Sequence, residues 1–162
     1  MRRRDFVTIL GLALLGGAAA TWRNLASFWQ PRFNGHTAHT VKVVTDLMFP
    51  GDGLPGAAEL KIYDRIVAME DLHETMAYGV AWLDSWARSN GASDFLALDD
   101  SKRSDAIDAA FASETEDARQ FAVIIRYHAG LTYYSDPVIK AAFAYTAPPQ
   151  PEGFPDFQDP PQ

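Results

Sequence analysis

The sequence predicts an all-α protein, an irregular bundle of about five helices followed by an extended tail rich in proline and aromatic residues. Two observations predict this class. Apolar residues recur at three- and four-residue spacing in successive segments, whereas no segment alternates with period two for long enough to form a strand. The 162 residues suit one domain, and their 48% hydrophobic content is ample for a packed core.

The first 20 residues are expected to be a signal peptide, with a basic start and a mildly apolar stretch that is short for a membrane span. Arg3, Arg4 and Phe6 resemble a twin-arginine export signal. Ala18 and Ala20 stand in the Ala-x-Ala relation of a cleavage site. An ordinary secretory signal and an uncleaved anchor remain the alternatives. Residues 21–35 are expected to form a linker with several aromatic residues.

A helical domain is expected over residues 36–146. Its first helix starts at His36 and stops at the Pro- and Gly-rich loop of residues 50–56. A second helix is predicted over 57–71 and a third over 74–89, where Asn90-Gly91 provides a left-handed stop.

Three more helical segments complete the predicted domain. Phe95 and Leu98 form a buried connector to a fourth helix over 100–112. Ser113 and Glu116 fit a capping box that opens the longest helix, which ends near Tyr133. A short helix over 138–144 and a proline-rich tail over 147–162 follow.

Composition excludes several classes of function. The formal net charge of −7 disfavours a nucleic-acid-binding surface, which needs clustered Lys and Arg. The absence of cysteine excludes disulfides, thiolate metal sites, Cys-ligated iron–sulfur clusters and haem attached through Cys-x-x-Cys-His.

The search for a catalytic or cofactor site in this chain finds weak candidates. His36 and His39, with Asp46 or His73, would be the ligands of an independent periplasmic metalloenzyme, although zinc normally requires three or four ligands. His128 is expected to be a core histidine on the apolar face of the long helix, and the methionines to fill the core. A helical module for a small ligand is a second alternative. We therefore predict no catalytic, cofactor-binding or metal-binding residues in this chain.

The C-terminal third carries more aromatic residues and prolines than a domain of this size needs inside. Tyrosine and phenylalanine are enriched at protein interfaces. The predicted partner interface comprises the following residues: Tyr133, Tyr134, Asp136, Pro137, Tyr145, Phe154 and Phe157. The alternative is that the tail wraps the chain's own bundle.

Several motifs resemble the small subunit of gluconate 2-dehydrogenase and its relatives. The segment 47–57, Leu-Met-Phe-Pro-Gly-Asp-Gly-Leu-Pro-Gly-Ala, is similar to an early signature of that family, and segments 79–84 and 91–98 resemble its middle. The most specific match is 130–137, Gly-Leu-Thr-Tyr-Tyr-Ser-Asp-Pro, followed by an aromatic and proline-containing tail.

The resemblance implies a non-catalytic accessory subunit of a periplasmic, membrane-associated oxidoreductase complex. Its partner would be a large FAD-dependent dehydrogenase of the glucose–methanol–choline type, which holds the FAD and the catalytic bases. A multihaem cytochrome c would often be a third subunit. The chain would stabilise the flavoprotein and carry it through the twin-arginine translocase.

Overall fold

A computed structural model describes residues 30–144, and the helical unit within it begins at Phe33. It contains the helices α2 (Gly35–Met48), α3 (Ile62–Val67), α4 (His73–Ser89), α5 (Asp100–Phe111), α6 (Glu116–Ser135) and α7 (Pro137–Ala142). Two single 3₁₀ turns, η1 (Glu70–Leu72) and η2 (Phe95–Ala97), connect them. The predicted all-α class is confirmed, and the described residues contain no strand.

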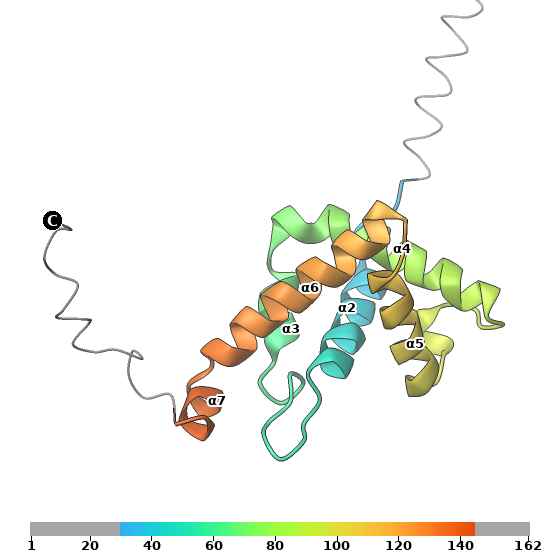
Figure 1. The fold of residues 1–162 in the computed structure, drawn as a ribbon. Coiled ribbons are helices and arrows are strands. Elements are labelled where there is room, and N and C mark those ends of the chain that lie inside the picture. The colour runs from blue at the N-terminus through green and yellow to red at the C-terminus, as the bar shows by residue number, and fades with distance from the viewer. Residues whose placement is uncertain (1–29, 145–162) are drawn as a thin grey trace, which may run out of the picture. The chain divides into compact units, whose positions relative to one another are not determined.

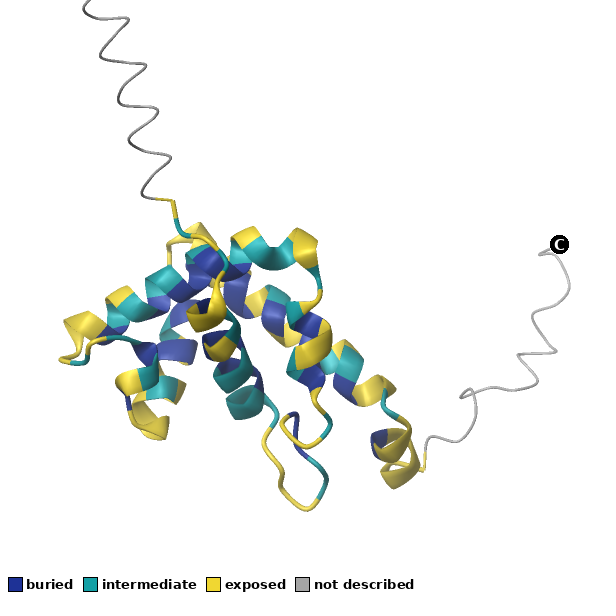
Figure 2. Ribbon diagram, turned by 180° about the vertical axis from the view of Figure 1, so that it is seen from behind, coloured by how far each residue is buried: buried dark blue, intermediate teal, exposed yellow. Residues whose placement is uncertain are grey.

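Helix α6 is the centre of the bundle. It packs against α2, α3, α4, α5 and α7, and Figure 1 shows it crossing the bundle as the longest helix. Its buried side is lined at helical spacing by the following residues: Ala118, Phe121, Ala122, Ile125, Ala129 and Tyr133. In Figure 2 the buried residues face the middle of the bundle, whereas α7 is mainly exposed.

Polar side chains set several helix starts. The Asn34 side chain accepts a hydrogen bond from the Thr37 backbone N–H at the start of α2, and Asp99 accepts one from Lys102 at the start of α5. Asp136 does the same for α7, whose first residue is Pro137. Gly91 has φ +87°, as the predicted left-handed stop after α4 requires.

The predicted second helix over 57–71 is wrong in extent. Only Ile62–Val67 are α-helical, because Lys61 adopts a left-handed conformation with φ 51° and separates the preceding turn from α3. The Ala57 N–H donates to the Phe49 carbonyl across the loop, over 2.8 Å. That bond closes the loop and fixes where residue 57 can lie.

The capping box at Ser113 is also wrong. The N-cap of α6 is Thr115, and the Ser113 Oγ instead accepts a hydrogen bond from the Thr115 N–H over 3.0 Å. The buried connector is confirmed, since Phe95 and Leu98 are almost fully buried.

The signal peptide with Arg3, Arg4, Phe6, Ala18 and Ala20, most of the predicted linker, and the tail with Tyr145, Phe154 and Phe157 lie outside the described residues. Within the part that the structure describes, no helix combines the length and the hydropathy needed to cross a bilayer.

Candidate partner-binding surface

Helix α6 carries a second apolar face that points away from the core. Val123, Tyr127, Leu131 and Tyr134 follow one another at four-, four- and three-residue spacing, so they are neighbours on the helix surface. Each is more than half exposed, between 51% and 64%. Val138 and Phe143 extend the exposed apolar surface over α7. We call these six residues the α6–α7 face.

Aromatic rings in tilted and edge-to-face contact support the C-terminal end of this face. The ring of Tyr134 lies 6.3 Å from that of Phe143 and 6.4 Å from that of Phe49, which belongs to the loop after α2. Tyr133 lies 5.3 Å from Phe49 on the inner side. The rings of Tyr133, Tyr134 and Phe49 therefore tie α6 to the loop of residues 49–56.

The predicted interface residues fall into three groups. Tyr134 and Pro137 are exposed, and Asp136 is half-buried as the N-cap of α7. Tyr133 is only 6% exposed, so its side chain supports the surface from the core side. Tyr145, Phe154 and Phe157 lie outside the described residues.

Residues that the sequence pattern placed on the inner side of α6 are partly outside. Leu131 is 57% exposed, and His128 is half-buried with its ring 5.2 Å from that of Tyr127, rather than a core histidine. Between Val123 and Tyr134, about three turns, α6 carries apolar residues on both its covered and its exposed side. Periodicity alone does not distinguish the side that other helices cover.

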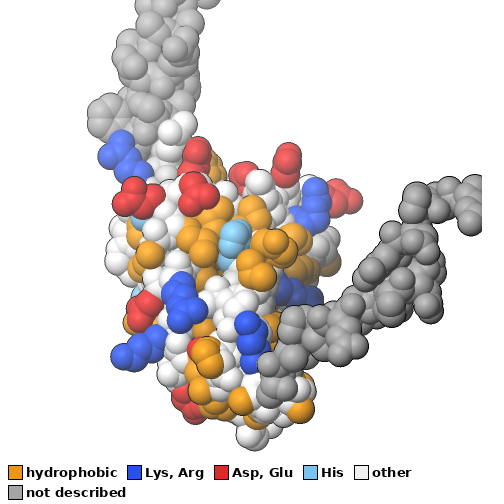
Figure 3. All heavy atoms as spheres, turned by 90° about the vertical axis from the view of Figure 1, so that its left-hand side faces the viewer, with side chains coloured by type: hydrophobic (Ala, Val, Ile, Leu, Met, Phe, Trp, Pro, Cys, Tyr) orange, Lys and Arg blue, Asp and Glu red, His pale blue; other side chains and the backbone are white. Residues whose placement is uncertain are grey.

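A groove lies between α6, α5 and the loop after α2, and its lining includes Val123, Tyr127 and Tyr134 of the α6–α7 face. It comprises two adjoining hollows of ≈ 340 Å³ and ≈ 590 Å³ that share Phe49, Phe111, Arg126 and Tyr134. The Arg126 guanidinium lies 5.7 Å from the centre of the Phe111 ring, a cation–π contact. Figure 3 shows a face of the molecule on which hydrophobic side chains lie side by side at the surface.

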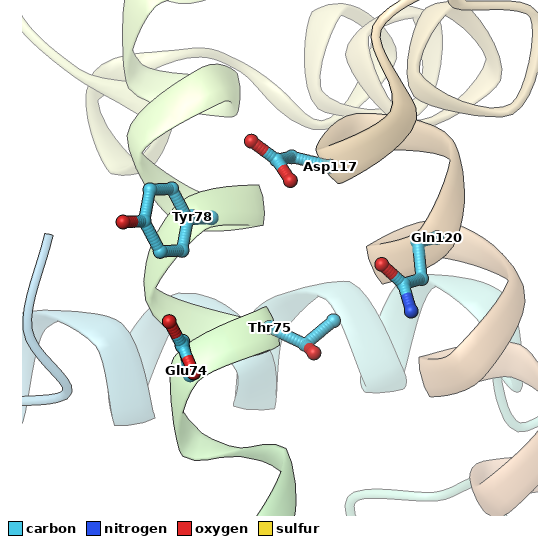
Figure 4. A pocket seen from close by; sticks show the side chains of 5 residues that line it. All are labelled: Glu74, Thr75, Tyr78, Asp117 and Gln120. Atoms are coloured by element: carbon cyan, nitrogen blue, oxygen red, sulfur yellow. The ribbon is translucent and has the colours of Figure 1, made fainter.

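A third, separate hollow lies between α4 and α6 and is polar. Glu74, Thr75 and Tyr78 of α4 face Asp117 and Gln120 of α6, and Figure 4 shows the five side chains standing apart around the opening. Glu74, Asp117 and Gln120 are exposed to solvent, whereas a general acid needs a desolvated neighbourhood. The hollow has the character of a solvated seam between two helices.

The histidines considered as metal ligands are separated. His36 Nε2 lies 2.9 Å from Asp84 Oδ2, and His73 Nε2 lies 2.8 Å from the Val67 carbonyl with its ring stacked on Phe33. His39 is exposed on α2. Within residues 30–144, no group of three His, Asp or Glu side chains is placed to hold a metal ion.

The family model for gluconate 2-dehydrogenase subunit 3 matches residues 35–149, which is most of the chain. The chain belongs to this family. Comparisons with curated proteins and with solved structures gave no match. The match confirms the resemblance drawn from the segments 47–57 and 130–137. The family consists of dehydrogenase subunits that belong to a multisubunit complex. The family match contains all of the α6–α7 face.

Proposed function

We propose that this chain is a non-catalytic accessory subunit that binds the large FAD-dependent subunit of a dehydrogenase of the glucose–methanol–choline type. The observation that carries the proposal is the α6–α7 face, six large apolar side chains each more than half exposed on a chain that belongs to a family of dehydrogenase subunits. Contiguous apolar surface of this kind marks sites of protein association.

The architecture around the face supports a binding role. Tyr134 is held by ring contacts with Phe49, Tyr133 and Phe143, so it presents apolar area at a low cost in side-chain entropy. Asp136 caps α7 and fixes the turn that places Val138 beside the end of α6. The polar end of a tyrosine tolerates both solvent and an interface, which suits a surface exposed before assembly.

The partner would supply the catalytic chemistry. In this proposal the FAD and the catalytic bases belong to the large subunit, and haem c to a cytochrome subunit where one is present. The small subunit stabilises the flavoprotein, and the complex is associated with the periplasmic side of the inner membrane. The sugar, polyol or acid that is oxidised would be chosen by the large subunit.

Co-expression with the proposed large FAD-dependent subunit tests the interface. Leu131→Glu with Val138→Glu places two charges on the α6–α7 face, and we expect at least a tenfold loss of co-purified flavoprotein. The matched control is Ser101→Glu with Gln120→Glu, which adds the same charge at exposed positions outside the face. Equal recovery of the flavoprotein with both double variants would refute the proposed interface.

The export role needs a separate test. If the chain carries a folded flavoprotein through the twin-arginine translocase, Arg3→Lys with Arg4→Lys leaves the flavoprotein in the cytoplasm. Arg2→Lys, outside the arginine pair, serves as the control. Normal amounts of periplasmic flavoprotein with the paired variant would contradict the export role and leave the binding role intact.

A further inference from the structure

We propose that, in the free subunit, the groove between α5, α6 and the loop after α2 holds the chain's own C-terminal segment, residues 154–157. This segment reads Phe-Pro-Asp-Phe. Its two rings would occupy the apolar parts of the groove, and the Asp156 carboxylate would lie beside Arg126. The inference concerns the chain alone and does not depend on the flavoprotein.

The groove has the chemistry to bind an acidic aromatic segment. Its walls include the apolar side chains of Met48, Phe49, Ile107 and Phe111. Arg126 makes no ion pair among the described residues, and it contacts the Phe111 ring instead. A guanidinium of this kind accepts both an aromatic face and a carboxylate. Asp108 lies on the α5 side, so the incoming carboxylate is expected on the α6 side.

The tail has the complementary composition. Residues 145–162 contain three acidic residues, Glu152, Asp156 and Asp159, and no Lys or Arg. Phe154 and Phe157 flank the middle acid. The six prolines of the tail limit the conformations of the free segment, which lowers the entropy cost of binding it in an extended form.

The length of chain is sufficient. From Tyr134 back to Val123 the groove side of α6 spans roughly 17 Å at 1.5 Å per residue. Phe154 follows Ala144 by ten positions, and an extended polyproline-type chain covers roughly 31 Å over that length. The described part of the chain ends at Ala144, next to Phe143, whose ring lies 6.3 Å from that of Tyr134 at the end of the groove. Covalent attachment there gives the segment a high effective concentration, of millimolar order for short flexible links.

Disulfide trapping in the purified full chain tests this placement, because the chain has no cysteine of its own. Ser104→Cys lies at the groove and Gln158→Cys lies next to Phe157, so both anchors are kept. The control pair is Ser85→Cys with Gln158→Cys, since Ser85 is exposed on α4 away from the groove lining. In a glutathione buffer we expect the groove pair to form its intramolecular disulfide at least tenfold more readily.

Two further variants test which side chains hold the tail segment in the groove. With Arg126→Gln, and separately with Phe154→Ser and Phe157→Ser together, the groove pair should form its disulfide no faster than the control pair. Cleavage by chymotrypsin after Phe157 should be slow in the unmodified chain and several-fold faster with Arg126→Gln.

The proposal is overturned if the two cysteine pairs close equally fast, or if Arg126→Gln changes neither readout. At a concentration at which the chain is monomeric, disulfide-linked dimers in place of the intramolecular bond would also overturn it, since they would place the tail of a second copy in the groove. The groove shares Val123, Tyr127 and Tyr134 with the α6–α7 face, but these experiments contain no flavoprotein, so their outcomes are read separately from the co-purification test of the accessory function.

Discussion

At Gly79 the helices α4 and α6 approach so closely that a side chain has no room. A Cβ built at this position would lie 2.1 Å from Cγ of Phe121, a ring that is itself buried in the core. Glycine normally weakens a helix interior, so its use in the middle of α4 reflects the contact with Phe121. Phe121 in turn anchors the inner side of α6.

Gly79→Ala is therefore expected to destabilise the domain. Overpacking costs about 1–3 kcal/mol, and the better helix propensity of alanine returns only about 1 kcal/mol. Gly35→Ala is the control, because a Cβ there meets nothing within 4 Å in the first turn of α2. Urea unfolding of the two variants measures the difference. Equal stability would show that Phe121 moves without cost.

The buried phenol of Tyr133 makes the stability of the domain depend on pH in alkaline solution. Burial, followed by the negative charge of Asp52, raises the pKa of the Tyr133 phenol above its usual value. The folded state thus holds the phenol proton more tightly than the unfolded state. Its contribution to stability is complete below about pH 10, and it is lost as the pH rises from there through the raised pKa.

Tyr133→Phe removes this contribution. We expect the free energy of unfolding to fall less steeply with pH above about pH 10 in the variant than in the unmodified chain. Some slope should remain, because the pKa of Tyr63 is also raised, mainly by its hydrogen bond with Asp64. Chemical unfolding at a series of alkaline pH values measures the slope. Identical slopes would mean that Tyr133 ionises alike in both states.

At the scale of elements, Asp84 connects three parts of the bundle. From α4 its Oδ1 accepts a hydrogen bond from the Phe95 N–H of η2 over 3.0 Å, and its Oδ2 lies 2.9 Å from His36 of α2. The two contacts of Asp84 differ in how much they contribute to the stability of the fold. Phe95 is fully buried, whereas the His36 side chain is 39% exposed, so water competes for its contact with Asp84.

Asp84→Ala should cost about 1–3 kcal/mol, because the Phe95 N–H loses its acceptor. Asp84→Asn retains a carbonyl oxygen for this bond and should cost less. His36→Ala should cost no more than about 1 kcal/mol, the range of an exposed pair. Thermal and urea unfolding of the three variants measure the order of their losses in stability. If His36→Ala were the most damaging, the contact between His36 and Asp84 would be the stronger link.

At the scale of the whole molecule, the chain is acidic, with a net charge of −7, and within residues 30–144 its large exposed apolar side chains are those of the α6–α7 face. Charge repulsion between copies keeps an acidic protein dispersed, whereas exposed Leu131, Val138 and Phe143 favour association. The two tendencies act on the same molecule at different places. The balance between them decides how the chain behaves without its partner.

We expect the isolated chain to self-associate as its concentration rises. Leu131→Glu with Val138→Glu should keep it near the monomer mass of 17.9 kDa over the same range. Sedimentation equilibrium measures the average mass, and Ser101→Glu with Gln120→Glu controls for the added charge. A monomeric unmodified chain throughout would show that the face does not drive association by itself.

The sequence by itself determined the helical class, the starts of α2 and α4 and the stop at Gly91, because caps, glycines, prolines and helical periodicity act between near neighbours. It also predicted Tyr134 and Pro137 as interface residues, from the density of aromatic residues and prolines in the C-terminal third, and both are exposed. Only the tertiary structure decided that Tyr133 points inward and Leu131 outward, and that α3 is six residues long. These outcomes depend on Phe49 and on the closed loop before α3, which reach their positions through contacts between segments far apart in the chain. A local pattern shows that a face is apolar, but other elements determine whether it is covered.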